Sequence, residues 1–524
     1  MVRPAVLGFV VLLAACGGSG PGRGYKPDAP RSKRLAVVPE EHRPADDTAP
    51  IYEAARRGGT KARLTLHPDA ALERVAGELV DTIGEDGEPP PVPVVDFAIR
   101  WHGLLDPAPM VLLASGPDVA GVAGAIEGLI AESGTLPYNR VGLATFPIPG
   151  GLRCLALVSM RYVDAEPVDL VTKAGGVFRL AAKILPPFAR PRVVVTSPDE
   201  SVAELPLADA REFVAQVPLP EPGRYDVEVL AEGERGITVL ANFPVWAGVE
   251  PPASIEVVPP APPATDASDV EDELVTQVND VRRRLKLPAL ERRTDLDRVA
   301  RAHGADMVKN RFVGHRSPTT GDPSDRLAKA GIVSGLVLEN IGRDYSARAL
   351  HEGLMRSPGH RANIVSREAT HLGVGVVAEP EGDRTAFIAT EVYVQFARQI
   401  VPANAEREFR EILNDRRRRS GAGAVEVDAE LSRIARSGAE RFFRDRLTQP
   451  DVTAAVQEEL EPFGLAYRRI GVIVTAVVTI DQAATIERLL ERDMTVIGVG
   501  IAQGNHPQHG NNAICVVVVL AWPR

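Results

Sequence analysis

The sequence predicts an α+β protein of several modules, because helical and strand-like patterns recur along its 524 residues. A helical motif with Leu, Arg and Ala in one register occurs three times, at Leu72–Ala76, Leu296–Ala300 and Leu431–Ala435. A Gly-Val-Gly element and a strand-like run follow the second and third copies. Between the first two copies, residues 165–248 have strand patterns separated by Pro and Gly turns, which is typical of a β-sandwich.

The second and third copies form a clear repeat, and the first is a weaker match. The same spacing separates Asn279 from Asn414 and Leu296 from Leu431. The third copy has Pro450 where His315 would fall, and it lacks the Ser-Pro-Gly-His segment of the second. We therefore expect two degenerate modules flanking one module with an intact polar cleft.

The composition excludes several kinds of protein. A net charge of −10 argues against a nucleic-acid partner, because phosphate binding requires a basic surface. Three cysteines are too few for a disulfide framework. Cys154 and Cys515 lie in apolar strand-like runs, where a free thiol is usually a buried hydrophobic group.

The N-terminus has the form of a secretory signal, with Arg3 followed by an apolar run too short to span a membrane. Leu13–Cys16 resembles a bacterial lipobox, which implies cleavage before Cys16 and a lipid on its thiol. Gly17 resembles the residue found in lipoproteins of the outer membrane. We expect a secreted, lipid-anchored protein of the bacterial cell envelope; plain secretion is the alternative.

The candidate site consists of polar residues at the edges of predicted elements. His315 follows one helix, and Glu339-Asn340 precedes a Ser357-Pro-Gly-His360 segment that follows a second helix, expected at 346–356. A Pro-Gly pair ends a helix and turns the chain, so it would bring His360 to the same cleft. We interpret Asn340 as a residue that fixes loop geometry and Ser357 as a turn or cap residue. We expect Arg361 and Asp325-Arg326 to form salt bridges that hold the cleft walls.

From about residue 270 to 399, the sequence resembles the CAP family (cysteine-rich secretory proteins, antigen 5 and pathogenesis-related 1, also called SCP-like) in its bacterial form. The matching residues are Asn279–Arg282, Leu296–Ala300, His315, Ser324–Leu327, Gly331, Glu339–Ile341, Ser357–Arg361, Asn363 and Leu372–Gly375. The resemblance implies α-β-α sandwich modules, one intact and two degenerate, and an immunoglobulin-like β-sandwich.

The expected organisation follows from these patterns. It comprises a lipoprotein signal peptide (1–16), a flexible tether (17–55), a degenerate CAP-like module (56–163), an immunoglobulin- or fibronectin-like sandwich (165–248), a Pro-rich linker (249–268), the intact CAP domain (269–399) and a second degenerate module (403–524).

The cleft residues support two hypotheses. Family members typically present two histidines and two glutamates; here His315, His360 and Glu339 match, and the second glutamate is absent. Two imidazoles and a carboxylate suit a divalent metal, zinc or calcium, or a general-base pair. The leading hypothesis is a non-enzymatic binding protein for an extracellular lipid, glycan or protein, held at the membrane through Cys16. The alternative is a metal-dependent hydrolase of peptides or cell-wall material, with His315 and His360 as ligands and Glu339 as base or third ligand. A third hypothesis is a structural spacer whose cleft is a relic.

Overall fold

The structure is a computed structural model, and the chain that it describes has an α+β fold. The described residues are 24–35, 42–83, 89–133, 136–207, 210–256, 266–332, 334, 336–381, 384–463, 466–506 and 509–524. The predicted signal peptide, the proposed anchor Cys16 and residues 257–265 of the predicted linker lie outside them. None of the described helices is both long and apolar enough to cross a membrane.

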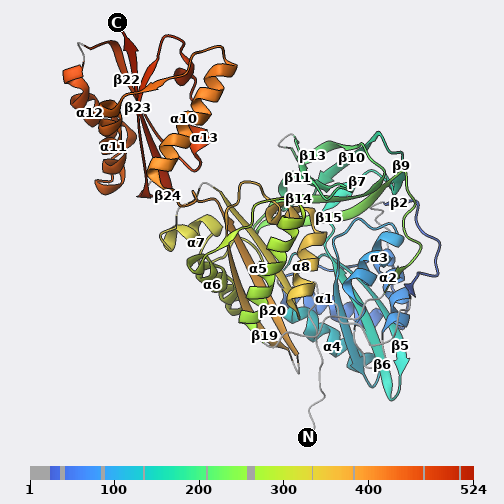
Figure 1. The fold of residues 1–524 in the computed structure, drawn as a ribbon. Coiled ribbons are helices and arrows are strands. Elements are labelled where there is room, and N and C mark those ends of the chain that lie inside the picture. The colour runs from blue at the N-terminus through green and yellow to red at the C-terminus, as the bar shows by residue number, and fades with distance from the viewer. Residues whose placement is uncertain are drawn as a thin grey trace.

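Three four-stranded sheets share one strand order, in which the first, third, fourth and second strands of each unit lie side by side (Figure 1). The first unit contains β3 (His67–Pro68), β4 (Met110–Gly116), β5 (Arg140–Ile148) and β6 (Gly151–Ser159). The second contains β17 (Glu291–Arg292), β18 (Val337–Asp344), β19 (His371–Glu381) and β20 (Arg384–Val394). The third contains β21 (Glu426–Val427), β22 (Tyr467–Val477), β23 (Val496–His506) and β24 (Gly510–Pro523).

Helices cover both faces of each sheet, and each face has its own apolar core. In the first unit these are α1 (Ala49–Lys61) and α4 (Val119–Glu132), opposite α2 (Ala70–Leu79) and α3 (Val92–Trp101). In the second they are α5 (Ala267–Arg284) and α8 (Ala347–Arg356), opposite α6 (Thr294–Asn310) and α7 (Pro323–Lys329). In the third they are α10 (Pro402–Arg419) and α13 (Ile480–Ala483), opposite α11 (Ala429–Arg444) and α12 (Gln449–Leu460). Short 3-10 turns lie at Val80–Thr82, Glu461–Phe463 and Glu487–Leu490.

Direct packing of a helix backbone on a strand explains the recurring Gly-Val-Gly element. A Cβ atom on Gly375 of β19 would lie 2.0 Å from the backbone nitrogen of Arg301 in α6. In the third unit, a Cβ atom on Gly500 of β23 would lie 2.1 Å from the backbone nitrogen of Arg436 in α11. Any side chain at these positions would therefore push the helix off the sheet.

Residues 163–247 form two sheets that share one core, and we call this part the sandwich. One sheet has the order β13-β10-β7 and the other β12-β11-β14-β15-β9. The strands are β7 (Val163–Ala165), β9 (Val171–Thr172), β10 (Gly176–Ile184), β11 (Ala189–Thr196), β12 (Val202–Leu205), β13 (Glu212–Leu219), β14 (Gly223–Gly233) and β15 (Gly236–Ala247).

The structure corrects the predicted tether and linker, because their described parts pack against the folded body. β1 (Gly24–Tyr25) pairs with β16 (Ile255–Glu256), and β2 (Arg34–Leu35) pairs with β8 (Val168–Asp169). Nearby, the Arg31 guanidinium lies 4.0 Å from the centre of the Trp101 ring, whose Nε1 donates a hydrogen bond to the Ala29 carbonyl. Helix α1 begins before residue 56, the expected start of the first module.

Candidate functional site

His315 and Glu339, which lie 24 residues apart in the chain, meet in the second unit. The imidazole follows the end of α6, and its Nδ1 lies 3.0 Å from Oε1 of Glu339 on β18. The other carboxylate oxygen accepts a hydrogen bond of 2.5 Å from Arg326 on α7. Arg326 also donates to the carbonyl oxygen of His315, so one guanidinium holds both candidate residues in place. Of the residues expected to form salt bridges in the cleft walls, Arg326 thus pairs with Glu339.

The electrostatic balance keeps Glu339 ionised although its side chain is only 2 % exposed. Burial opposes the charge, but the hydrogen bond with His315 and the positive charge of Arg326 outweigh it and hold the Glu339 pKa below its ordinary value. His303 lies 3.9 Å from the same carboxylate. His303 is packed in the interior of the domain, and burial lowers the pKa of its imidazole.

His360 lies on a short helix, which the sequence did not predict. The Pro358-Gly359 pair opens α9 (Pro358–Ile364), and the Ser357 side chain caps it by accepting from the backbone nitrogen of His360. Proline is favoured in the first turn because its fixed φ suits a helix, so the pair begins a helix here and does not form a loop. Ser357 is thus a cap residue, and its Oγ also lies 2.8 Å from Nδ1 of His360.

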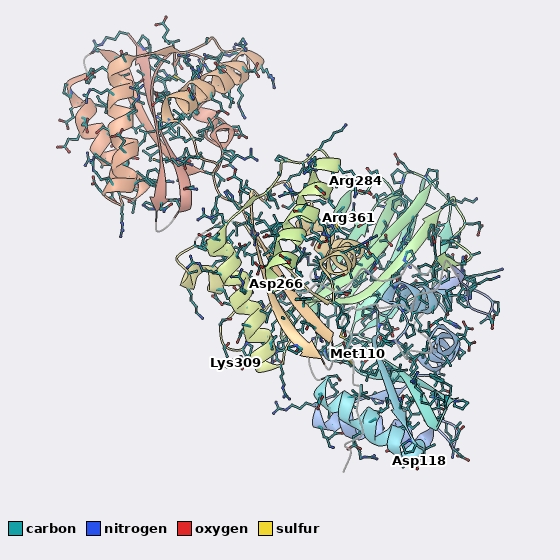
Figure 2. The ribbon with its side chains drawn as sticks, turned by 60° about the horizontal axis from the view of Figure 1, so that its bottom comes forward. Met110, Asp118, Asp266, Arg284, Lys309 and Arg361 are labelled. Carbon is teal, nitrogen blue, oxygen red and sulfur yellow. The ribbon has the colours of Figure 1, made fainter. Side chains whose placement is uncertain are left out.

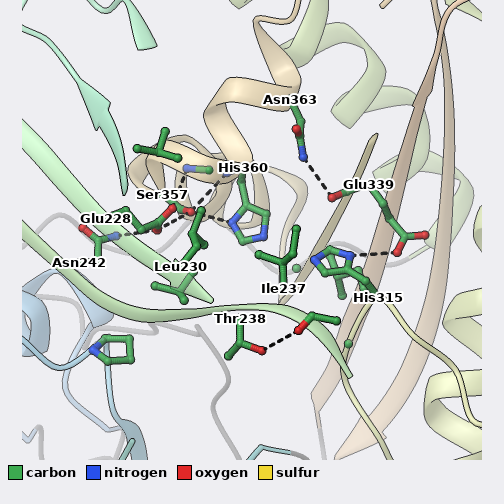
Figure 3. A pocket seen from close by; sticks show the side chains of 18 of the residues that line it. Glu228, Leu230, Ile237, Thr238, Asn242, His315, Glu339, Ser357, His360 and Asn363 are labelled. Atoms are coloured by element: carbon green, nitrogen blue, oxygen red, sulfur yellow. Dashed lines mark hydrogen bonds and ion pairs between the residues drawn. The ribbon is translucent and has the colours of Figure 1, made fainter. Parts of the chain in front are cut away.

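A carboxylate from the sandwich reaches this helix (Figure 3). Glu228 on β14 accepts hydrogen bonds of 2.7 Å from Oγ of Ser357 and from the backbone nitrogen of Gly359. Its residue exposure is 0 %. Burial raises the pKa of Glu228 to about 7, against the lowering effect of the two hydrogen bonds, and Asp226 raises it further.

Asn340 and Arg361 hold the surroundings of α9. The Asn340 amide donates to the carbonyl oxygen of His360 and to the buried Glu391 carboxyl group, as expected for a residue that fixes local geometry. Arg361 pairs with Glu200 of the sandwich at 3.1 Å, and Arg284 pairs with the same carboxylate at 2.9 Å. Figure 2 shows the two arginines beside each other. Arg361 therefore joins the second unit to the sandwich.

A cavity of about 690 Å³ lies where the first unit, the sandwich and the second unit meet. The second unit contributes His315, Glu339 and His360 to its wall. The hairpin of β14 and β15 covers this side, because the backbone nitrogen of Arg316 donates to the carbonyl oxygen of Arg235. The first-unit and sandwich sides carry both apolar and charged residues. The apolar ones include Met110, Leu136, Tyr138, Met160, Val194, Leu230 and Ile237, and the charged ones include Asp96, Arg100, Arg192, Glu204, Arg224, Glu228, Glu232 and Arg235. The candidate cleft is thus one wall of a cavity between three units.

The residues present do not fit a divalent metal in this arrangement. Among the residues that the structure describes, no group of three or more His, Cys, Asp and Glu is placed to hold a metal ion. Both oxygens of Glu339 are occupied, one by His315 and one by Arg326. A guanidinium bonded to a carboxylate also repels a cation that would bind there.

The second unit matches the model of a known family. Residues 275–395 match the model of the cysteine-rich secretory protein family, CAP, so the second unit of this chain is a CAP domain. The uncharacterized protein YkwD of Bacillus subtilis (strain 168) is 33 % identical over 114 residues, which cover 22 % of this chain and 44 % of that protein. The uncharacterized membrane protein YlbC of the same organism is 34 % identical over 107 residues, 20 % of this chain and 31 % of that protein. The chain therefore matches less than half the length of either relative.

A solved structure is also similar to part of this chain. The crystal structure of an extracellular protein containing a SCP domain from Bacillus anthracis is 22 % identical, covers 33 % of this chain and 65 % of that chain, and has a TM-score of 0.23.

Sequence reasoning did not find Arg326's role as the partner of Glu339, nor Glu228 at all. Glu228 belongs to an alternating strand of another unit, where a charged residue normally faces solvent. No local signal in the sequence distinguishes it from its exposed neighbours on other strands.

Proposed function

We propose that this protein is a non-enzymatic binding protein of the bacterial cell envelope, and that the cavity beside the CAP domain holds its ligand. The cavity carries the proposal: three units line it, apolar side chains such as Met110, Met160 and Ile237 form part of its wall, and polar groups from all three units face it as well. A cavity of about 690 Å³ with partly apolar walls favours a small amphipathic molecule, such as a lipid or glycolipid, over a protein surface.

The cellular setting is part of the same proposal. The apolar run and lipobox-like Leu13–Cys16 support export and a lipid anchor at the outer membrane. The shared strand order supports an origin of the first and third units as degenerate CAP-like modules. The two-sheet core of residues 163–247 supports an immunoglobulin-like module that serves to close the cavity.

A cavity-filling variant tests the proposal. Ala108 lines the cavity, so Ala108→Trp should occupy part of the space, whereas Ala120 is exposed on α4 outside the lining and Ala120→Trp is the matched control. We expect the neutral fluorescent probe N-phenyl-1-naphthylamine to bind the parent and the control and to lose binding in Ala108→Trp. Absence of binding to the parent, or equal binding to all three proteins, would contradict a ligand cavity.

Calorimetry tests the hydrolase alternative. Because Glu339 is engaged by Arg326, we expect the full chain to show no stoichiometric binding of zinc or calcium. Stoichiometric binding that disappears in both His315→Ala and His360→Ala would overturn this expectation and would make a metal-dependent reaction the better hypothesis.

A further inference from the structure

His360 faces the cavity with one ring nitrogen, and the other is held by a chain of hydrogen bonds that ends in another unit. Nδ1 lies 2.8 Å from Oγ of Ser357, and that hydroxyl donates to Oε1 of Glu228 at 2.7 Å. Over the described residues, Nε2 of His360 has no hydrogen-bond partner, and the residue lines the cavity. Figure 3 shows the imidazole between Ser357 and the space beside Ile237.

The direction of these hydrogen bonds follows from counting protons. A serine hydroxyl has one proton, and next to an ionised Glu228 it donates that proton to the carboxylate. The backbone nitrogen of Gly359 already donates to the other carboxylate oxygen, so both oxygens act as acceptors. Oγ of Ser357 can then only accept from His360, which requires a proton on Nδ1. Nε2 is left with its lone pair directed at the cavity.

We propose that Glu228 is a positioning residue that completes the CAP site from the sandwich: through Ser357 it fixes His360 as a hydrogen-bond acceptor, so that the cavity selects a neutral ligand with a hydroxyl or amide N–H donor. This inference rests on the proposed binding function. It assigns to Glu228 the place of a second cleft carboxylate, which the CAP segment itself lacks.

The charges around the cavity are consistent with a neutral ligand. Arg192 pairs with Glu204, and Arg100 pairs with Asp96. Glu339 is likewise neutralised by Arg326. A charged ligand beside these three pairs would have to break them or lie without a counter-charge, and both cost free energy. An uncharged donor group needs only the lone pair of His360.

The tautomer of His360 can be measured without any ligand. The full chain is labelled with ¹⁵N in its 10 histidines, and His360 is assigned with a His360→Gln variant. At about pH 8.5, above the pKa of Glu228, we expect a protonated Nδ1 and an unprotonated Nε2. A neutral His360 protonated at Nε2 would overturn the inference.

Glu228→Gln gives the sharper result. The side-chain oxygen of the glutamine can accept from Gly359, and its NH₂ group then takes the place of Oε1, which accepts from both Ser357 and Asn242. This NH₂ group donates to Ser357 and, once the Asn242 amide has turned its oxygen inward, to Asn242. The Ser357 hydroxyl then donates to Nδ1 of His360. The tautomer should reverse and leave a proton on Nε2. Glu232→Gln on the same strand is the matched control, because Glu232 contacts arginines and not Ser357. A His360 tautomer that is unchanged in Glu228→Gln would contradict the positioning role.

Two probes test the ligand class. 1-Decanol has a donor head group and decyl methyl ether has an acceptor alone, and displacement of N-phenyl-1-naphthylamine reports both. We expect the ether to bind about three- to tenfold more weakly than the alcohol in the parent, the value of one neutral hydrogen bond. In Glu228→Gln this preference should disappear or reverse. Equal binding of both probes to the parent would contradict donor selection.

The outcomes separate the inference from the function on which it rests. If neither probe binds, the proposed cavity function fails, and the tautomer measurement still decides whether Glu228 positions His360. If the probes bind but the tautomer is insensitive to Glu228→Gln, the cavity stands and the inference fails.

Discussion

Glu339 and Arg326 form a buried ion pair inside the CAP domain, with side-chain exposures of 2 % and 5 %. Glu339→Gln removes one charge and leaves the other buried without a partner. We expect the free energy of unfolding of the CAP domain to fall by about 3–5 kcal/mol, the usual cost of breaking a buried pair. Hydrogen exchange of the peptides that cover β18 in the full chain would measure this loss.

The double variant Glu339→Gln with Arg326→Met is the control for that prediction. It removes both charges, so it should recover a large part of the lost protection. If Glu339→Gln alone is as stable as the parent, the Glu339–Arg326 ion pair does not contribute to the stability of the CAP domain. If Glu339→Gln is stable, a loss of hydrolase activity in this variant would show that the carboxylate takes part in the reaction. If the variant is unstable, a loss of activity cannot be assigned to catalysis.

His351 on the amphipathic helix α8 is only 9 % exposed. Burial lowers its pKa from 6.5 to about 4. A histidine with a lowered pKa in the folded state contributes stability above pH 6.5 that is lost as the pH falls through about 4, because the unfolded chain binds the proton first. The loss should reach up to about 3 kcal/mol.

Urea unfolding at several pH values between about 4 and 6.5, monitored by hydrogen exchange of α8, would measure this loss of unfolding free energy. His351→Gln removes the titrating group and should flatten the pH dependence, whatever its effect at neutral pH. An equally steep decline in His351→Gln would assign the acid sensitivity to other groups.

At the scale of elements, the contact between α9 and strand β14 joins the CAP domain to the sandwich. A Cβ atom on Gly359 would lie 2.8 Å from Oε2 of Glu228 and 3.2 Å from Cδ1 of Leu230. We therefore expect Gly359→Ala to weaken this contact by about 1–3 kcal/mol, although alanine favours a helix. Faster hydrogen exchange in both α9 and β14 would be the signature.

Gly124 provides the matched control, because it also lies in a helix and a Cβ atom there would meet no atom within 4 Å. Gly124→Ala should be neutral or slightly stabilising, by up to about 1 kcal/mol. If Gly359→Ala behaves in the same way, the close approach of α9 and the sandwich does not contribute to stability.

The elements predicted from sequence are those whose signals are local. The helix before Ser357 begins with a Ser346 cap and ends at Arg356, as the pattern indicated. The Gly-Val-Gly strands are also recognisable from a short motif, because each glycine is required where one helix backbone packs directly on the strand. The opening of α9 was missed because the same Pro-Gly pair can end one helix or start another, and the Ser357 cap decides which.

The site depended on long-range contacts that periodicity does not encode. His315, Glu339 and His360 were found by resemblance and do line one cavity. Glu228, 129 residues before Ser357, became part of it only through the packing of two units. The N-terminal segment was taken for a tether for the same reason, since its partner Trp101 lies 72 residues from Ala29.

At the scale of the whole molecule, the third unit stands apart from the other three parts in Figure 1. It joins the CAP domain through the segment after β20, where Gln503 bonds to the backbone of Arg398 and Ile400. Its two cores are made of its own helices and strands together with Ala397 of this segment. The cavity, by contrast, has no lining residue from the third unit among the described residues.

A chain truncated after Arg398 should therefore keep the cavity and lose only the third unit. Phe396, which packs in the CAP core, is retained, and the free energy of unfolding of the remaining units should change by less than about 1 kcal/mol because only Ala397 loses its cover. Binding of N-phenyl-1-naphthylamine and hydrogen exchange in α9 and β14 should match those of the full chain. Weaker probe binding, or faster hydrogen exchange in the sandwich, would mean that the third unit stabilises the cavity. The third unit would then not be independent of the other units in solution.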